Sequence, residues 1–316
     1  APYDQFLGRL LSRRYPLRTM TKPTSNDKAV PPRSVVAITE CLVTVVEYIM
    51  IASLSSTIIR SSHLESDLLS ISASVFASLA MLSWMMHRHW SSYDFPISKY
   101  AEMLGLHQVR LSTISLFLIM LLAISHIALC WIHSMSGSTS VSWSNLYNSN
   151  GWFNWRLMVE MVIIAPIQEE IVFRGIIMSI LRRRMPDNKL VIVSGSCGFF
   201  SLIHMLNFAS NKYSTQYVCL QILLSFLISG FYSIRIIMSR SLWESIILHA
   251  LNNFLACFVS QHAELNIFGD PLLLFPLVQT FIVFSALFWL SWRAVDIPLE
   301  NGQSKDILIR ETNKTQ

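Results

Sequence analysis

Eight apolar stretches dominate this chain, and each is long enough, or nearly long enough, to cross a lipid bilayer as a helix. A spanning helix needs about 20 mostly apolar residues. The stretches are 34–59, 68–86, 111–133, 155–181, 190–207, 216–238, 242–262 and 272–292. Two are marginal, because 190–207 is short and 155–181 contains three glutamates and two arginines. The pattern predicts an all-α, polytopic protein of the lipid bilayer with about eight transmembrane helices.

Composition supports this class and excludes several others. Of the 316 residues, 53% are hydrophobic and 14% are charged, whereas soluble domains carry about 25% charged residues. The mean hydropathy of +0.47 excludes a disordered, collagen-like or disulfide-stapled secreted chain. Residues 1–33 hold seven basic and two acidic residues, which accounts for the whole net charge of +5. The neutral remainder predicts no nucleic-acid partner.

Cationic residues predict the orientation of the helices, because loops on one side of a membrane collect Lys and Arg. With the N-terminus inside, 19 cations fall in inside segments and three in outside segments or at span ends. Both termini are therefore expected on the positive side, which is cytoplasmic or matrix-like. We divide the chain into a basic segment 1–33, an eight-helix membrane domain 34–292 and a polar tail 293–316.

The first fifteen residues place apolar side chains on one helical face and arginines elsewhere. This pattern fits an interfacial helix and also part of an organellar targeting segment. The second interpretation favours an organellar inner membrane, although the endoplasmic reticulum or a bacterial inner membrane fits the topology equally well. The inside connection 87–110 is expected to contain a short amphipathic helix around Lys99–Leu106.

Ionisable side chains inside spans are costly in lipid and indicate function or pairing. In the fourth span, Glu170 and Arg174 are four residues apart, which places them on one helical face and predicts a salt bridge. Glu169 is rotated about 100° from Glu170, has no partner on its own helix and is free to point into a cavity. Glu40, Glu47 and Glu160 are interpreted as pairing or cavity-lining residues.

Two further spans carry polar pairs at helical spacing. Phe200 and His204 share a face of the fifth span, and His249 and Asn253 share a face of the seventh. A lone histidine on an apolar helix is also compatible with a satisfied core residue, and the His249 pair with a hydrogen bond between helices. Counted at ~1.5 Å per residue from the inside ends of the three spans, their polar groups lie within a membrane core about 30 Å thick. Their polar groups can therefore meet in one buried chamber.

Three motifs in chain order resemble the signature of the CAAX protease and bacteriocin-processing family, namely Glu169-Glu170-x-x-x-Arg174, Phe200-x-x-x-His204 and His249-x-x-x-Asn253. The family consists of intramembrane glutamate proteases and includes the Ras-converting prenyl endopeptidase. The similar stretch covers about 165–254. The predicted count of eight membrane helices also resembles that of the family.

The resemblance implies a role for each motif residue. Glu169 and His204 would orient and deprotonate a water molecule. His249 and Asn253 would stabilise the oxyanion, while Glu170 and Arg174, with Phe200 beside them, would hold the site together. Glu, His and His could instead bind zinc, but no H-E-x-x-H is present, so we expect a metal-independent site without a cofactor.

These observations predict an intramembrane, glutamate-dependent endopeptidase that hydrolyses a membrane-tethered peptide, including a lipidated one. The alternative is a protease-like fold that serves as a structural or accessory subunit of a larger membrane complex. In that case, partner subunits would order the polar N- and C-terminal segments.

Overall fold

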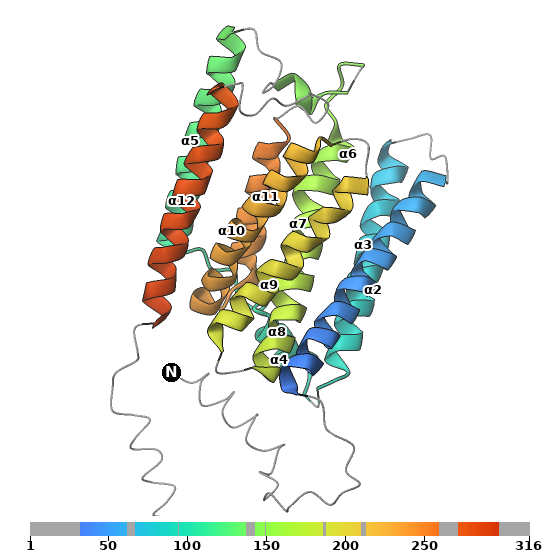
Figure 1. Cartoon of the computed structure of the whole chain (residues 1–316). Coiled ribbons are helices and arrows are strands. Elements are labelled where there is room, and N and C mark those ends of the chain that lie inside the picture. The colour runs from blue at the N-terminus through green and yellow to red at the C-terminus, as the bar shows by residue number, and fades with distance from the viewer. Residues whose placement is uncertain are drawn as a thin grey trace, which may run out of the picture.

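The computed structural model describes residues 32–61, 67–93, 95–136, 143–148, 150–185, 188–209, 213–258 and 271–296. The predicted N-terminal interfacial helix and nearly all of the polar C-terminal tail lie outside these residues. Within them the chain forms helices joined by short connections (Figure 1) and no strand, apart from an isolated bridge between Tyr147 and Phe153. The all-α fold class is confirmed.

Helices run through all eight predicted spans as far as the described residues extend. The long ones are α2 (Arg33–Ser61), α3 (Asp67–Trp90), α5 (Thr113–Ser136), α10 (Thr215–Ser239) and α12 (Pro271–Asp296). Helix α9 (Lys189–Ile203) continues into a 3-10 segment, η4 (His204–Ala209), and α11 (Leu242–Ala256) has 15 residues. Five of the described helical stretches are long and apolar enough to cross a membrane, namely 33–54, 68–90, 189–209, 215–239 and 274–295.

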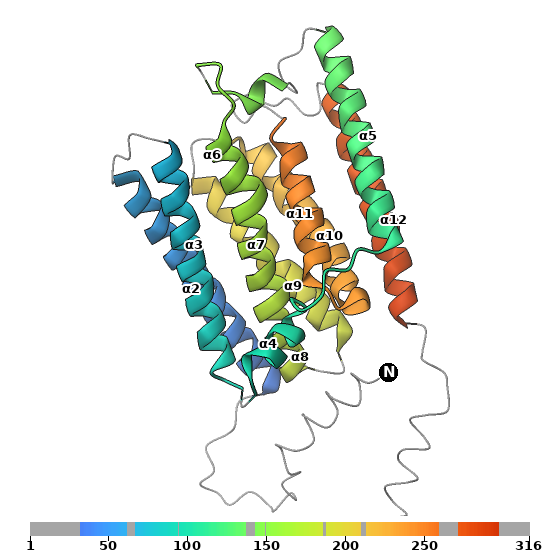
Figure 2. The same ribbon diagram turned by 180° about the vertical axis from the view of Figure 1, so that it is seen from behind.

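The fourth span is a composite helix that the sequence did not predict in detail. It passes without a break through α6 (Trp155–Met158), η2 (Val159–Ile164), α7 (Ala165–Glu169), η3 (Glu170–Ile177) and α8 (Met178–Arg184). Both η2 and η3 are π-helical. π-Helical turns are rare and appear frequently at functional sites. The composite helix occupies the middle of the bundle (Figure 2), and every residue from 170 to 181 is buried.

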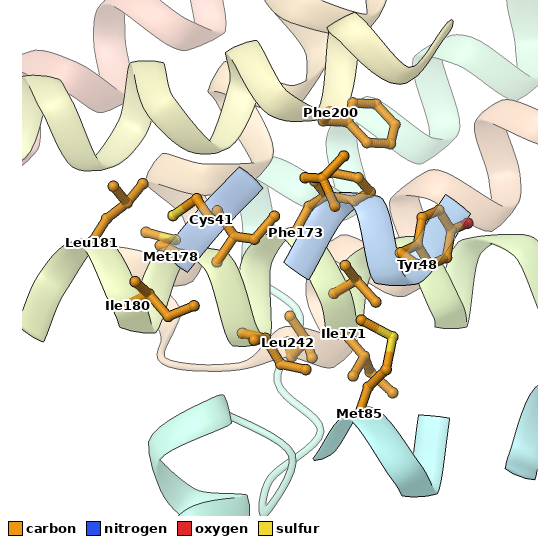
Figure 3. Packing of buried hydrophobic residues seen from close by; sticks show 14 of the residues in the cluster. Cys41, Tyr48, Met85, Ile171, Phe173, Met178, Ile180, Leu181, Phe200 and Leu242 are labelled. Atoms are coloured by element: carbon orange, nitrogen blue, oxygen red, sulfur yellow. The ribbon is translucent and has the colours of Figure 1, made fainter. Parts of the chain in front are cut away.

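Apolar packing fixes this central helix against its neighbours. The largest buried cluster combines residues of α2, α3, η3, α8, α9 and α11, with Phe173 lying between Tyr48 and Phe200 (Figure 3). A second cluster joins α5, α10, α11 and α12 around Phe231 and Phe284. Because each cluster includes residues of α11, this helix packs against neighbouring helices on two sides.

A short helix near the start of α11 confirms the prediction for the inside connection. Helix α4 (Ile97–Leu104) ends at Gly105, which has a left-handed φ of 78°. The carbonyl of Gly105 accepts a hydrogen bond from the backbone N–H of Leu242 (2.9 Å), and Trp243 Nε1 donates to the carbonyl of Leu106 (3.0 Å). The α4 turn therefore anchors the first residues of α11.

Candidate active site

His249 on α11 contacts both adjacent glutamates of the composite helix. Its Nδ1 lies 2.8 Å from Glu170 Oε1, and its Nε2 lies 3.5 Å from Glu169 Oε2. The two ring nitrogens therefore face different carboxylates. The prediction that Glu169 lacks a partner holds for its own helix only, because the partner comes from a helix about 80 residues later.

Glu170 and Arg174 form the predicted ion pair. Arg174 Nη1 lies 3.0 Å from Glu170 Oε1, and both side chains are fully buried. The guanidinium also lies 4.2 Å from the centroid of the Phe200 ring. A buried carboxylate needs such partners because an isolated charge is costly away from water. Glu169 differs from Glu170 in retaining 16% side-chain exposure, so it is the less enclosed of the two carboxylates.

The ring of Phe200 packs against both histidines. Its ring is edge-on to His204 (5.2 Å between centroids) and to His249 (5.7 Å). His204 sits where α9 ends and the 3-10 segment η4 begins. It is close enough to His249 for an electrostatic interaction. The three motifs therefore lie in one region of the bundle, which their predicted depths allowed.

Asn253 makes a hydrogen bond between helices. Its Nδ2 donates to the backbone carbonyl of Met161 (2.9 Å) in the π-helical segment η2. In this segment the N–H of Ala165 bonds five residues back, to Glu160. The next such donor would be Pro166, which has no N–H, so the Met161 carbonyl is available to Asn253. This bond joins two helices, and among the described residues it uses one of the two amide hydrogens of Asn253, so the other remains for another acceptor.

Two tyrosines close to the site were missed by sequence reasoning. Tyr48 on α2 packs edge-on against Phe173 and is close enough to Glu169 for an electrostatic interaction. The Tyr232 ring on α10 lies 6.3 Å from that of His249 and 5.9 Å from the Arg174 guanidinium. A tyrosine in the middle of a span is a weak signal of a functional site in a sequence. Whether it faces the site depends on which helices pack against its side of the span, and the sequence does not give that.

The other intramembrane acids are paired, as predicted. Glu160 accepts from Ser74 Oγ (2.8 Å) and Arg156 Nε (3.2 Å). Glu40 pairs with two arginines at the end of α8, and Glu47 pairs with Arg88 at the end of α3. These acids lie apart from the His249 contacts. Among the described residues, no group of three or more His, Cys, Asp or Glu side chains is arranged to hold a metal ion.

Comparison with known proteins connects this geometry to a family. Residues 150–255 match the family of type II CAAX prenyl endopeptidase Rce1-like proteins. The matched stretch is about a third of the chain and contains the whole composite helix and all of the predicted site residues. No curated protein and no solved structure matched the chain. The segment from residue 150 to residue 255 is therefore similar to type II CAAX prenyl endopeptidase Rce1-like proteins, and it lies within an all-α membrane protein.

Proposed function

We propose that this chain is an intramembrane endopeptidase in which Glu169 activates water to hydrolyse a membrane-tethered peptide, including a lipidated one. The observation that carries the proposal is the position of His249 between the two adjacent carboxylates. The match of residues 150–255 to a family of endopeptidases supports the reaction class. The glutamate mechanism and the substrate class are parts of the proposal.

In the proposed mechanism both ring nitrogens of His249 donate, one toward each carboxylate. Glu170, which is buried against Arg174, accepts from Nδ1–H. With Nε2–H directed toward Glu169, the imidazolium and Arg174 balance the two carboxylates. A balanced group is the arrangement that costs least in a medium of low dielectric constant. In this state, Nε2–H is a charged donor beside Glu169.

Hydrolysis then follows from the positions of these groups. Glu169 removes a proton from a water molecule as the water oxygen bonds to the carbonyl carbon of the peptide. The negative charge that develops on the carbonyl oxygen is stabilised by Nε2–H of His249, because a preorganised donor at that position favours the transition state. The carbon–nitrogen bond then breaks, and the proton on Glu169 passes to the leaving amine.

The remaining motif residues orient the water, donate to the oxyanion or position His249. His204, edge-on to Phe200, orients the attacking water. The second amide hydrogen of Asn253 supplies another donor to the oxyanion. Glu170 and Arg174 fix the ring of His249, so they are positioning residues and do not touch the substrate. No step requires a metal or a cofactor.

The test is the substitution Glu169→Gln, which removes the base while retaining the size of the side chain. We expect cleavage of a fluorescent lipidated peptide in proteoliposomes to fall at least ~100-fold, the lower end of what a general base contributes. The control is Glu160→Gln on the same composite helix, where the acid is bonded to Ser74 and Arg156. Full activity in the Glu169 variant would contradict the glutamate mechanism.

The accessory-subunit alternative makes the opposite prediction. It requires the purified wild-type chain to cleave neither lipidated nor unmodified tethered peptides. It also requires the Glu169→Gln chain to support the host complex as well as the wild type does. Both results together would replace the protease proposal.

A further inference from the structure

The two carboxylate oxygens of Glu170 differ in their surroundings. Oε1 lies 2.8 Å from His249 Nδ1 and 3.0 Å from Arg174 Nη1. Oε2 is buried and accepts no hydrogen bond from the described residues. A buried acceptor without a donor costs free energy, and a charged acceptor costs more than a neutral one. A donor beside Oε2 would therefore stabilise the carboxylate that contacts His249.

Ser245 carries a hydroxyl one helical turn before His249 on α11. Residues four apart lie on the same helical face, so Ser245 shares the face from which His249 contacts Glu170. Ser245 is 0% exposed, and its side chain is close enough to Glu170 for a hydrogen bond. None of the three motifs includes this serine. Its hydroxyl is the donor that the second oxygen of Glu170 can use.

The hydroxyl of Ser245 has two acceptors within reach. In the structure it donates to the backbone carbonyl of Leu242, three residues back, at 2.8 Å. That carbonyl belongs to the first turn of α11, where carbonyls also accept from the N–H four residues later. Glu170 Oε2 has no donor among the described residues, and hydrogen bonds to ionised groups are about twice as strong as neutral ones. Because a serine hydroxyl rotates, the carboxylate is the acceptor that gains more from it.

We propose that Ser245 is a further positioning residue of the site, and that its hydroxyl donates to Glu170 Oε2. Helix α11 then holds this carboxylate at two points one turn apart, through Ser245 at Oε2 and His249 at Oε1. A carboxylate held at both oxygens cannot turn, so the ring of His249 keeps Nε2 directed toward Glu169. The effect on catalysis rests on the proposed function, whereas the hydrogen bond does not depend on proteolysis.

Nuclear magnetic resonance of the histidine rings tests the hydrogen bond without any cleavage. The sample is the full chain in detergent micelles with ¹⁵N-labelled histidine, and substitution of His249 identifies its Nδ1–H resonance. In Ser245→Ala the carboxylate that accepts this proton loses one support. We therefore expect the resonance to shift and the proton to exchange with water at least several-fold faster.

The matched control is Ser225→Ala on α10. Ser225 Oγ donates to the backbone carbonyl of Ile222 at 3.0 Å, also three residues back. This variant therefore removes the same kind of backbone bond as Ser245→Ala does, and it should leave the His249 resonance in place. A resonance and an exchange rate that are unchanged in Ser245→Ala, or equally changed in both variants, would overturn the proposal.

Kinetics with a fluorescent lipidated peptide in proteoliposomes test the consequence for the reaction. We expect kcat of Ser245→Ala to fall about tenfold, or ~1.4 kcal/mol, with KM unchanged, because Ser245 does not contact the substrate. Ser225→Ala should retain both constants. A raised KM with unchanged kcat would assign Ser245 to substrate binding and contradict a positioning role.

The two measurements separate this inference from the proposed function. If the wild-type chain cleaves no peptide, the protease proposal fails, and the resonance of His249 still decides whether Ser245 holds Glu170. If the wild-type chain cleaves, a fall in kcat together with a displaced resonance supports positioning through Glu170. A fall in kcat with an undisturbed resonance, or full activity with a displaced one, would overturn the positioning role while leaving the glutamate mechanism in place.

Discussion

At the scale of single residues, His249 determines what each glutamate contributes to stability. Glu170 contacts both His249 and Arg174 and is fully buried, whereas Glu169 has His249 as its ion-pair partner among the described residues, at the longer distance of 3.5 Å. Removing one member of a buried pair leaves its partner charged and uncompensated. The two adjacent carboxylates should therefore respond differently to substitution.

A melting series on three variants measures this difference. Arg174→Ala and Glu170→Ala should each lower the free energy of unfolding by about 3–5 kcal/mol, since each breaks a fully buried pair. Glu169→Ala leaves His249 with its Glu170 contact, so it should cost much less. A general-base side chain held in an apolar site can even oppose stability. Equal melting temperatures for Glu169→Ala and Arg174→Ala would make Glu169 a structural residue.

Sequence reasoning at this scale worked where partners share a helix. The Glu170–Arg174 and Phe200–His204 relations follow from a four-residue spacing, and both are present. The contact of Glu169 with His249 joins distant segments, so no spacing rule could give it. The bond from Asn253 to the Met161 carbonyl depends on a π-helical turn beside Pro166, which a helical wheel with 3.6 residues per turn does not represent.

At the scale of elements, α11 depends on contacts at its first turn. Besides the Gly105 and Leu106 bonds, Glu244 receives hydrogen bonds from Ser112 N–H (3.2 Å) and from Arg235 Nε and Nη2 (3.2 Å each), and also from Ser115. Glu244 is fully buried and lies five residues before His249. The position of the histidine thus follows from a loop that belongs to none of the three motifs.

Substituting Gly105 tests this dependence. A Cβ at this position would lie 2.9 Å from Leu242 N and 3.0 Å from the Arg240 carbonyl oxygen, at a φ of 78°. Gly105→Ala should therefore cost ~1–2 kcal/mol for the left-handed backbone and about 1–3 kcal/mol more for the overpacking. The control is Gly151→Ala, which has φ 76° but open space around its Cβ. Equal melting temperatures of the two variants would show that the contact with α11 is unimportant.

At the scale of the whole molecule, hydropathy predicted the helical spans, but it could not predict how they pack. Spans such as α12 are apolar over most of their length, and their lipid-facing side carries large apolar residues like those of the core. The lipid-facing set includes Met50, Phe76, Ile124 and Phe281, each of which would read as a core residue in a soluble protein. In such a bundle the buried polar side chains are the signal that distinguishes inside from outside, and they are distributed over several helices.

The orientation of the bundle in its membrane is a prediction that labelling can test. Ser91 at the end of α3 and Ser214 at the start of α10 lie near opposite ends of the bundle and are exposed. In a background without native cysteines, a membrane-impermeant maleimide added to sealed vesicles should label Ser91→Cys and Ser214→Cys from opposite sides. A C-terminal tag should share the side of Ser91→Cys. A tag that shares the side of Ser214→Cys would contradict the topology inferred from the cations.

The position of Glu169 along the composite helix has a consequence for the length of any peptide that is cleaved. It lies 14 residues from Trp155 and 15 from Arg184, so at ~1.5 Å per residue it is about 20 Å from either end. An extended chain covers that distance with roughly six residues, whichever side it enters from. A cleavable bond closer than this to a bulky folded domain cannot reach the carboxylate. The bundle would therefore select its targets first by the reach of their tails, before any side chain is compared.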